Sequence, residues 1–179
     1  MVLIVLFIFD FLFTGVIKFF GTLAQSDPAG VIDQCPVFLH YVLSILNCGE
    51  LPLMNVAIET LGILGHIEDG KKALFADSTR TSDIMGGLCR HVQSTVVDSR
   101  ERALDSLALI FWVADPPTEE MSELVKGVYV KLTLQPIDML MNIAKQPFQG
   151  LRCRALKVFQ SLAKYKWAQQ DMIDCAGKL

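Results

Sequence analysis

Four segments of the chain share one pattern, and this internal repeat constrains the fold more than any other feature. Each copy has a small or branched residue, an aliphatic residue, a polar residue, a bulky apolar residue two positions later and an aliphatic residue three positions after that. The copies are VIKFFGTL at 16–23, AIETLGIL at 57–64, ALDSLALI at 103–110 and ALKVFQSL at 155–162. Their starts lie 41, 46 and 52 residues apart. Apolar residues three or four positions apart share one face of a helix, so each copy predicts a helix that packs against its neighbours.

Proline and glycine divide most of the chain into segments with helical periodicity, and no run alternates as a strand would. Periods near ~40 to 47 residues built only of helices are typical of HEAT and armadillo arrays. We therefore predict an all-α fold, a right-handed α-solenoid of armadillo/HEAT-like repeats, with about four repeats in residues 11–179. The end helices lack a polar capping face, so we expect these repeats to be part of a longer array. The predicted breaks are Asp27-Pro28, Cys35-Pro36, Gly49 to Pro52, Asp69-Gly70, Ala76 to Arg80, Asp115 to Pro117, Gln135-Pro136 and Gln146-Pro147.

The first residues, Met1 to Phe9, are all apolar and allow three interpretations. A transmembrane span would have to include Asp10 and Lys18, and a carboxylate in mid-bilayer costs roughly 2.5 to 3.5 kcal/mol. A signal peptide needs a basic start, which is missing, although Thr22-Leu23-Ala24 resembles a cleavage site. We favour the third interpretation, in which residues 1–10 are a hydrophobic lead-in and residues 11–23 form a buried helix.

Composition excludes several classes of protein. A chain of 179 residues with 52% hydrophobic and 20% charged residues is too apolar to be disordered and long enough to bury a core. Sixteen basic and 19 acidic residues give a net charge of −3, without the basic excess that nucleic-acid binding requires. Five cysteines without a CxxC pair are typical of reduced, buried thiols in a cytosolic protein. They are Cys35, Cys48, Cys89, Cys153 and Cys175.

No motif predicts an enzyme, a metal site or a cofactor. Gly65 to Lys72 imitates the phosphate-binding pattern GxxxxGK, but a helix precedes it and Lys72 replaces the magnesium-binding Ser or Thr, so we interpret it as a turn between helices. Cys89 and His91 lack further ligands at zinc-binding spacing. A hydrolase with a Cys-His pair stays open as a third hypothesis. Trp112 and Trp167 lie at predicted helix ends, where packing between repeats is the simpler role.

In an armadillo repeat, the helix that carries this motif lines a concave groove. By alignment, the polar positions at or near the groove are Lys18, Thr22, Asn55, Glu59, Glu101, Asp105, Cys153, Lys157 and Ser161. Nuclear-import receptors have a ladder of Trp and Asn there, of which only Asn55 is present, so we do not expect this chain to bind extended basic peptides. The alternative interpretation is that these residues form an ordinary solvated surface.

Several stretches resemble a single family. They are 15–24 (GVIKFFGTLA), 56–65 (VAIETLGILG), 68–71 (EDGK), 146–148 (QPF), 155–159 (ALKVF) and 167–169 (WAQ). In this order they resemble the 26S proteasome non-ATPase regulatory subunit 5 family, from about Phe11 to Gly177, in the later half of its repeat array. Residues 1–10 match nothing in the family.

The resemblance implies a non-enzymatic assembly chaperone of the 26S proteasome base. Such a chaperone binds the C-terminal domain of a proteasomal AAA ATPase subunit and is absent from the mature proteasome. The resemblance implies a cytoplasmic location, with the nucleus as a second compartment, and no nucleic-acid, small-molecule or membrane partner. The alternative from another class is a membrane-tethered or secreted helical-repeat scaffold, which the apolar residues Met1 to Phe13 would favour.

Overall fold

The computed structural model describes residues 15–47, 50–114 and 116–176, and within these ranges every regular element is a helix. A first helical stretch covers 15–23. The helices that follow are α2 (Pro28–Gln34), α3 (Pro36–Ile45), α4 (Leu51–Leu64), α5 (Glu68–Leu74), α6 (Ser78–Val92), α7 (Val97–Phe111), α8 (Glu119–Tyr129), α9 (Pro136–Ala144), α10 (Gln149–Leu162) and α11 (Lys166–Ala176). The prediction of an all-α fold is confirmed.

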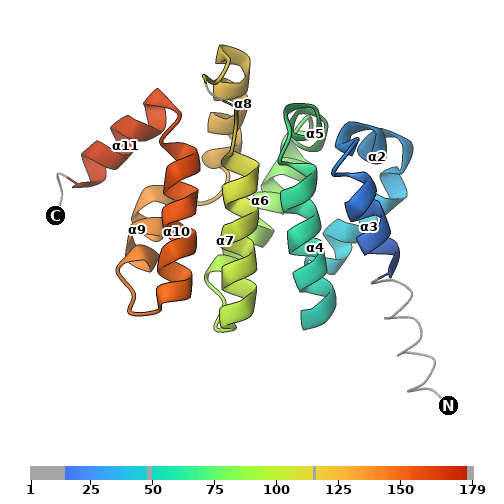
Figure 1. Ribbon diagram of the computed structural model, residues 1–179, viewed down its shortest axis with the longest axis horizontal. Helices are drawn as coiled ribbons and strands as arrows, with labels where there is room; N and C mark the ends of the chain where they lie inside the picture. The colour runs from blue at the N-terminus through green and yellow to red at the C-terminus, as the bar shows by residue number, and fades with distance from the viewer. Residues whose placement is uncertain (1–14, 48–49, 115, 177–179) are drawn as a thin grey trace.

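The helices form repeated units of three. Helices α2, α3 and α4 make one unit, α5, α6 and α7 the next, and α8, α9 and α10 the third. The third helices α4, α7 and α10 lie side by side, with the stretch 15–23 beside α4 (Figure 1). These four helices carry the four copies of the sequence motif, so the predicted array of helical repeats is confirmed. The handedness of its superhelix stays a prediction.

Proline and capping side chains start many of the helices. Pro28, Pro36 and Pro136 occupy the first turns of α2, α3 and α9, where the missing N–H has no helical partner in any case. Thr118 accepts a hydrogen bond from the Met121 N–H at 3.2 Å and so caps the N-terminus of α8. The break predicted at Asp69-Gly70 is wrong, because α5 begins at Glu68 and contains both residues.

Small residues let the third helices approach closely. A Cβ on Gly62 of α4 would lie 2.9 Å from the Ser106 Cα on α7. The Ser106 hydroxyl donates to the Ile58 carbonyl at 2.7 Å, which joins α7 to α4. These contacts place the buried faces of successive motifs against one another and build a continuous apolar core.

Lys71 is the lysine of the GxxxxGK pattern. Its side chain is fully buried, and its ammonium donates to the carbonyls of Gly65, His66 (3.1 Å) and Ile110 (2.7 Å). These carbonyls lie at the ends of α4 and α7. Lys71 therefore joins two repeats. The interpretation of this segment as a turn between helices holds for Gly65 to Ile67, whereas Glu68 to Lys72 belong to α5.

Both tryptophans pack between repeats. Trp112 ends α7 and packs against His66 in a tilted arrangement, at 4.8 Å between ring centroids, with the Lys164 ammonium 5.0 Å from its ring. Trp167 packs against Tyr129 at 4.9 Å. This confirms the role expected from the sequence.

The interpretations of the apolar start fall on residues 1–14, outside the described part of the chain. The following stretch, 15–23, is helical, but only one side of it is buried: Ile17 is inaccessible, whereas Val16 and Phe19 are exposed. The expectation of a buried helix is therefore correct only for that side. None of the described helices has the length and apolar character needed to cross a membrane.

Candidate protein-binding surface

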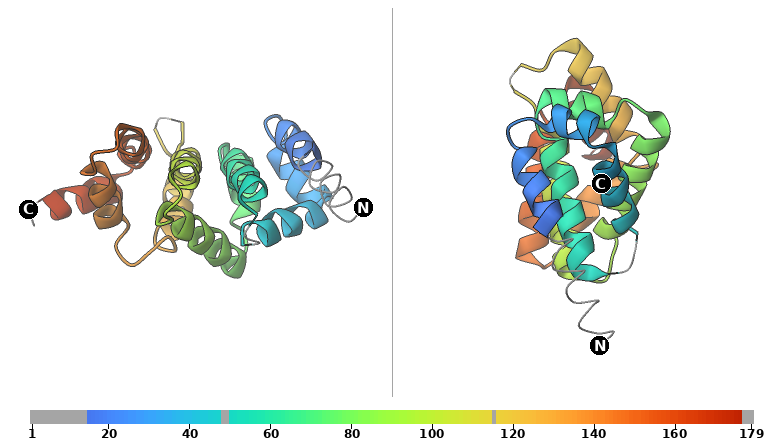
Figure 2. Two further views of the ribbon diagram at one scale, coloured as in Figure 1. Left: turned by 90° about the horizontal axis from the view of Figure 1, so that it is seen from below. Right: turned by 90° about the vertical axis from the view of Figure 1, so that its right-hand side faces the viewer.

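The exposed sides of 15–23, α4, α7 and α10 form one continuous surface, which we call the third-helix face. In the left view of Figure 2, these helices form a gently concave upper row, with the other helices of the units below them. The surface spans every described repeat, so a bound protein could contact several helices at once.

A network of polar contacts joins α4 to α7 across this face. Arg102 of α7 forms an ion pair with Glu59 of α4 and a second with Asp98 of its own helix, at 2.9 Å. The Asn55 amide donates to the same Asp98 carboxylate at 2.7 Å. Hydrogen bonding to Asp98 and the nearby Glu59 raise the pKa of Arg102, which keeps it charged.

A second network joins α7 to α10. Arg154 of α10 contacts Asp105 at 2.8 Å and Glu101 at 3.2 Å, both on α7. Lys157 lies 3.6 Å from the other oxygen of Asp105 and keeps 63% of its side chain exposed. Partly exposed pairs of this kind each stabilise a fold by about 0 to 1 kcal/mol, so their main effect is to fix the pattern of charge on the surface.

The structure places most of the predicted groove residues on the third-helix face. Asn55, Glu59, Glu101, Asp105 and Lys157 all belong to the two networks. Lys18, Thr22 and Cys153 are exposed on 15–23 and α10, and the Thr22 hydroxyl donates to the Lys18 carbonyl at 2.9 Å.

Ser161 is the exception and requires a correction. It is only 6% exposed, and its hydroxyl donates to the Ala108 carbonyl of α7 at 2.8 Å. This side chain joins α10 to α7 inside the array, so it cannot contact a partner on the surface.

Sequence reasoning missed Asp98 and the two arginines that hold the networks together. The aligned repeats contain a signal for the arginines, because Arg102 and Arg154 each stand immediately before the motif of their helix. The spacing of Asp98 and Arg102, four residues apart on one helix, indicates their ion pair. The partners of the arginines on the adjacent repeat can be identified only once it is known which helices lie side by side.

An open hollow lies where 15–23, α4 and the start of α7 meet. Its volume is about 490 Å³. Lys18, Asn55, Glu59, Asp98 and Arg102 line it together with apolar side chains. A hollow of mixed polar and apolar lining is suited to receiving side chains of another protein.

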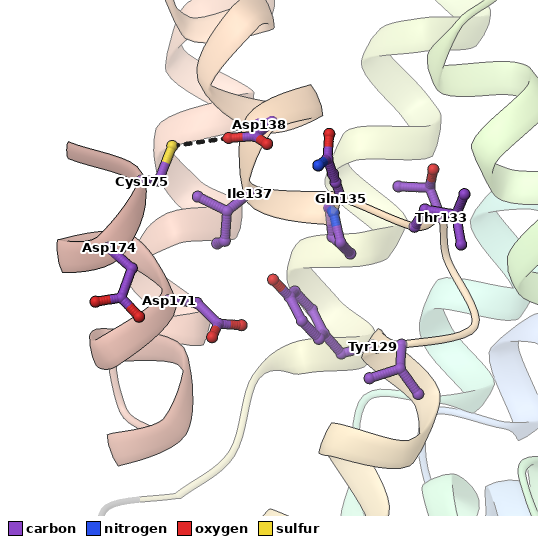
Figure 3. A pocket seen from close by; sticks show the side chains of 11 residues that line it. Tyr129, Thr133, Gln135, Ile137, Asp138, Asp171, Asp174 and Cys175 are labelled. Atoms are coloured by element: carbon purple, nitrogen blue, oxygen red, sulfur yellow. Dashed lines mark hydrogen bonds between the residues drawn. The ribbon is translucent and has the colours of Figure 1, made fainter. Parts of the chain in front are cut away.

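A second hollow, of about 400 Å³, lies between α8, α9 and α11. Figure 3 shows Tyr129, Asp138, Asp171 and Cys175 around it, and the Cys175 thiol lies 3.0 Å from an Asp138 oxygen. Burial, and then the neighbouring Asp171 carboxylate, raise the pKa of Tyr129, so its hydroxyl stays protonated. No set of three or more acidic, histidine or cysteine side chains suited to a metal ion occurs in the described residues.

The hypothesis of a Cys-His pair bears first on Cys89, which lies two residues before His91. Cys35, Cys89 and Cys153 are reduced thiols, and the Cys175 thiol contacts Asp138. Burial raises the pKa of Cys89, which lowers its thiolate fraction. Cys153 is exposed and Cys35 and Cys89 are half-buried, so the expectation of buried thiols is correct only for Cys175 among these four.

Comparisons with known proteins agree with the repeats and the resemblance. A family model described as proteasome non-ATPase 26S subunit matches residues 8–179. The chain is 30% identical to 26S proteasome non-ATPase regulatory subunit 5 of Bos taurus, over 94% of this chain and 34% of that protein. It is 30% identical to the protein of that name from Homo sapiens, with the same coverage, and 25% identical to that from Drosophila melanogaster, over 86% of this chain and 31% of that protein. The chain thus spans about a third of the length of the curated relatives it matches.

Proposed function

Because the chain belongs to the proteasome non-ATPase 26S subunit family, we propose that it is a non-enzymatic assembly chaperone of the proteasome regulatory particle base. In this proposal it binds the C-terminal domain of one AAA ATPase subunit, in the cytoplasm and also in the nucleus. It is absent from the mature proteasome. The family match supports the link with the proteasome, and the third-helix face supports the mode of action.

The observation that carries the proposal is the continuous charged face of four neighbouring helices. Two arginines are held between carboxylates, so positive and negative charge alternate across α4, α7 and α10. A stable interface between proteins buries about 1,200 to 2,000 Å², which a row of helices can provide and a single pocket cannot. Alternating charge favours one orientation of a folded partner and disfavours others.

The residues proposed to contact the partner are Lys18, Thr22, Asn55, Glu59, Glu101, Asp105 and Lys157. Those bound to Arg102 or Arg154 have less freedom to reorient, so less side-chain entropy would be lost on binding. Lys18 and Lys157 keep more exposed ammonium groups that could attract acidic groups of the partner.

Occupation of the ATPase C-terminal domain would act by steric exclusion. A solenoid bound there would prevent the incomplete ATPase ring from docking on the core particle. Its release after ring assembly would then permit docking. This mechanism needs no catalytic residue, in keeping with a surface of paired charges.

The test is a pull-down with the immobilised chain and separately expressed C-terminal domains of the regulatory-particle ATPases. The variant E59Q/D105N keeps the side-chain shapes but removes two negative charges from the third-helix face. We expect the wild-type chain to capture one domain selectively and this variant to capture it less well. The matched control E119Q/E123Q removes two exposed charges from α8, outside the face, and should leave capture unchanged.

Two results would count against the proposal. Failure of every ATPase domain to bind would contradict the chaperone function. Equal capture by the wild-type chain and E59Q/D105N would contradict the assignment of binding to this face.

A further inference from the structure

The ion pairs of the third-helix face follow a rule that one junction breaks. The polar residue at the third position of a motif pairs with the residue just before the next motif: Glu59 with Arg102, and Asp105 with Arg154. Each pair links neighbouring third helices, so an acid and an arginine form a rung between repeats.

At the junction between 15–23 and α4, both residues of this rung are different. Lys18 occupies the third position of its motif, and Val56 stands just before the next motif. A lysine thus stands where the other two junctions have an acidic residue, and an uncharged valine stands where they have an arginine. Lys18 is exposed and forms no ion pair with any described residue within 4.0 Å.

The hollow of about 490 Å³ lies at this incomplete rung. Four apolar side chains contribute to its lining, Leu51, Pro52, Val56 and Val96. Its two carboxylates, Glu59 and Asp98, are both paired with Arg102. Among the residues that line the hollow, Lys18 is therefore the one whose charge has no counterion from the described part of the chain.

We propose that this hollow is an anchoring site for the protein partner, which supplies the missing acidic group. An aspartate or glutamate of the partner pairs with Lys18, and an adjacent apolar side chain of the partner fills the space over Val56. The volume lies within the range of about 300 to 1,000 Å³ that is usual for binding pockets. The inference rests on the proposed function and identifies the chemistry of one contact within it.

Two variants test the site with the ATPase domain captured by the wild-type chain. K18E reverses the charge of an exposed side chain. The double variant K18E/V56R rebuilds the acid–arginine rung found at the other junctions and places a long side chain in the hollow. We expect both to fold with the wild-type helical signal in circular dichroism and to raise the Kd for the domain by about tenfold or more.

The control is K131E, which reverses an exposed lysine outside the third-helix face and should bind like the wild type. An unchanged Kd in K18E, or an equal loss in K131E, overturns the anchoring site and leaves the proposed function standing. If the wild-type chain binds no ATPase domain, the proposed function fails and the anchoring site fails with it.

Discussion

Lys71 has an unusual environment for a lysine, because its side chain is buried among backbone carbonyls. Its three carbonyl acceptors belong to the ends of two neighbouring repeats, and its side chain is inaccessible to water. K71M keeps much of the apolar stem but leaves these carbonyls with no ammonium donor. We expect the free energy of unfolding to fall by about 2 to 4 kcal/mol, measured by urea denaturation.

The neighbouring Lys72 supplies the control. Its ammonium is paired with Glu120 at the surface, so K72M should unfold close to the wild-type midpoint. Equal stability of K71M and the wild type would contradict the role assigned to Lys71.

The same lysine predicts a pH dependence of stability. Burial lowers the pKa of Lys71 from its ordinary 10.5 to about 7, and Glu68 opposes this only in part. Between these two values the unfolded chain binds more protons than the folded one, so the contribution of Lys71 to the free energy of unfolding increases with pH. We expect the stability difference between the wild type and K71M to grow from pH 7 to 9, measured by urea unfolding at each pH. A constant difference would mean that Lys71 stays charged in the folded protein.

The sequence alone could exclude a phosphate loop at Lys71 but could not find what this lysine does. Its partner Ile110 lies 39 residues away, and only the packing of α5 against the end of α7 brings them together. The same limit applies to the ion pairs of Arg102 and Arg154, which depend on contacts between repeats. Residue types at aligned positions indicate such contacts, whereas their geometry depends on the arrangement of the helices.

At the scale of helices, the contact between α4 and α7 depends on the absence of a side chain at Gly62. A Cβ there would come within 2.9 Å of both the Cα and the hydroxyl of Ser106, so G62A must push the helices apart or distort them. Overpacking of this kind costs about 1 to 3 kcal/mol. We expect a loss of this size in the free energy of unfolding, measured by chemical denaturation.

At Gly127 we expect a glycine-to-alanine substitution to raise the free energy of unfolding, the opposite of its effect at Gly62. Gly127 lies exposed within α8 with nothing near its missing Cβ, so G127A should stabilise the fold by up to about 1 kcal/mol through helix propensity. If both variants were stabilised, close packing at Gly62 would be ruled out.

Helix boundaries were predictable where proline marks them, as at Pro28, Pro36 and Pro136. The junction between α6 and α7 was missed because it contains neither proline nor glycine. There the Ser94 hydroxyl accepts from the Val96 N–H at 3.1 Å, and Arg100 donates to the Val92 carbonyl near the end of α6. Side chains add these hydrogen bonds to the backbone bonds from Gln93 and Ser94, and composition alone does not mark the turn.

At the scale of the whole molecule, the repeat motif identified the third helices correctly because each copy must bury the same face against its neighbours. It also indicated which polar positions share the third-helix face. The motif could not distinguish exposed polar positions from those whose side chains form a hydrogen bond to a neighbouring repeat, as Ser161 does with Ala108. That distinction depends on how closely α7 and α10 approach.

The proposed action of this chain on the regulatory particle during assembly can be tested in cells. Native complexes are fractionated from cells that express the tagged chain, and each fraction is probed for the tag and for ATPase subunits. We expect the chain to migrate with ATPase subunits in complexes smaller than the proteasome and to be absent from the assembled 26S particle. Recovery of the chain in the assembled particle, in amounts equal to its permanent subunits, would contradict the proposal.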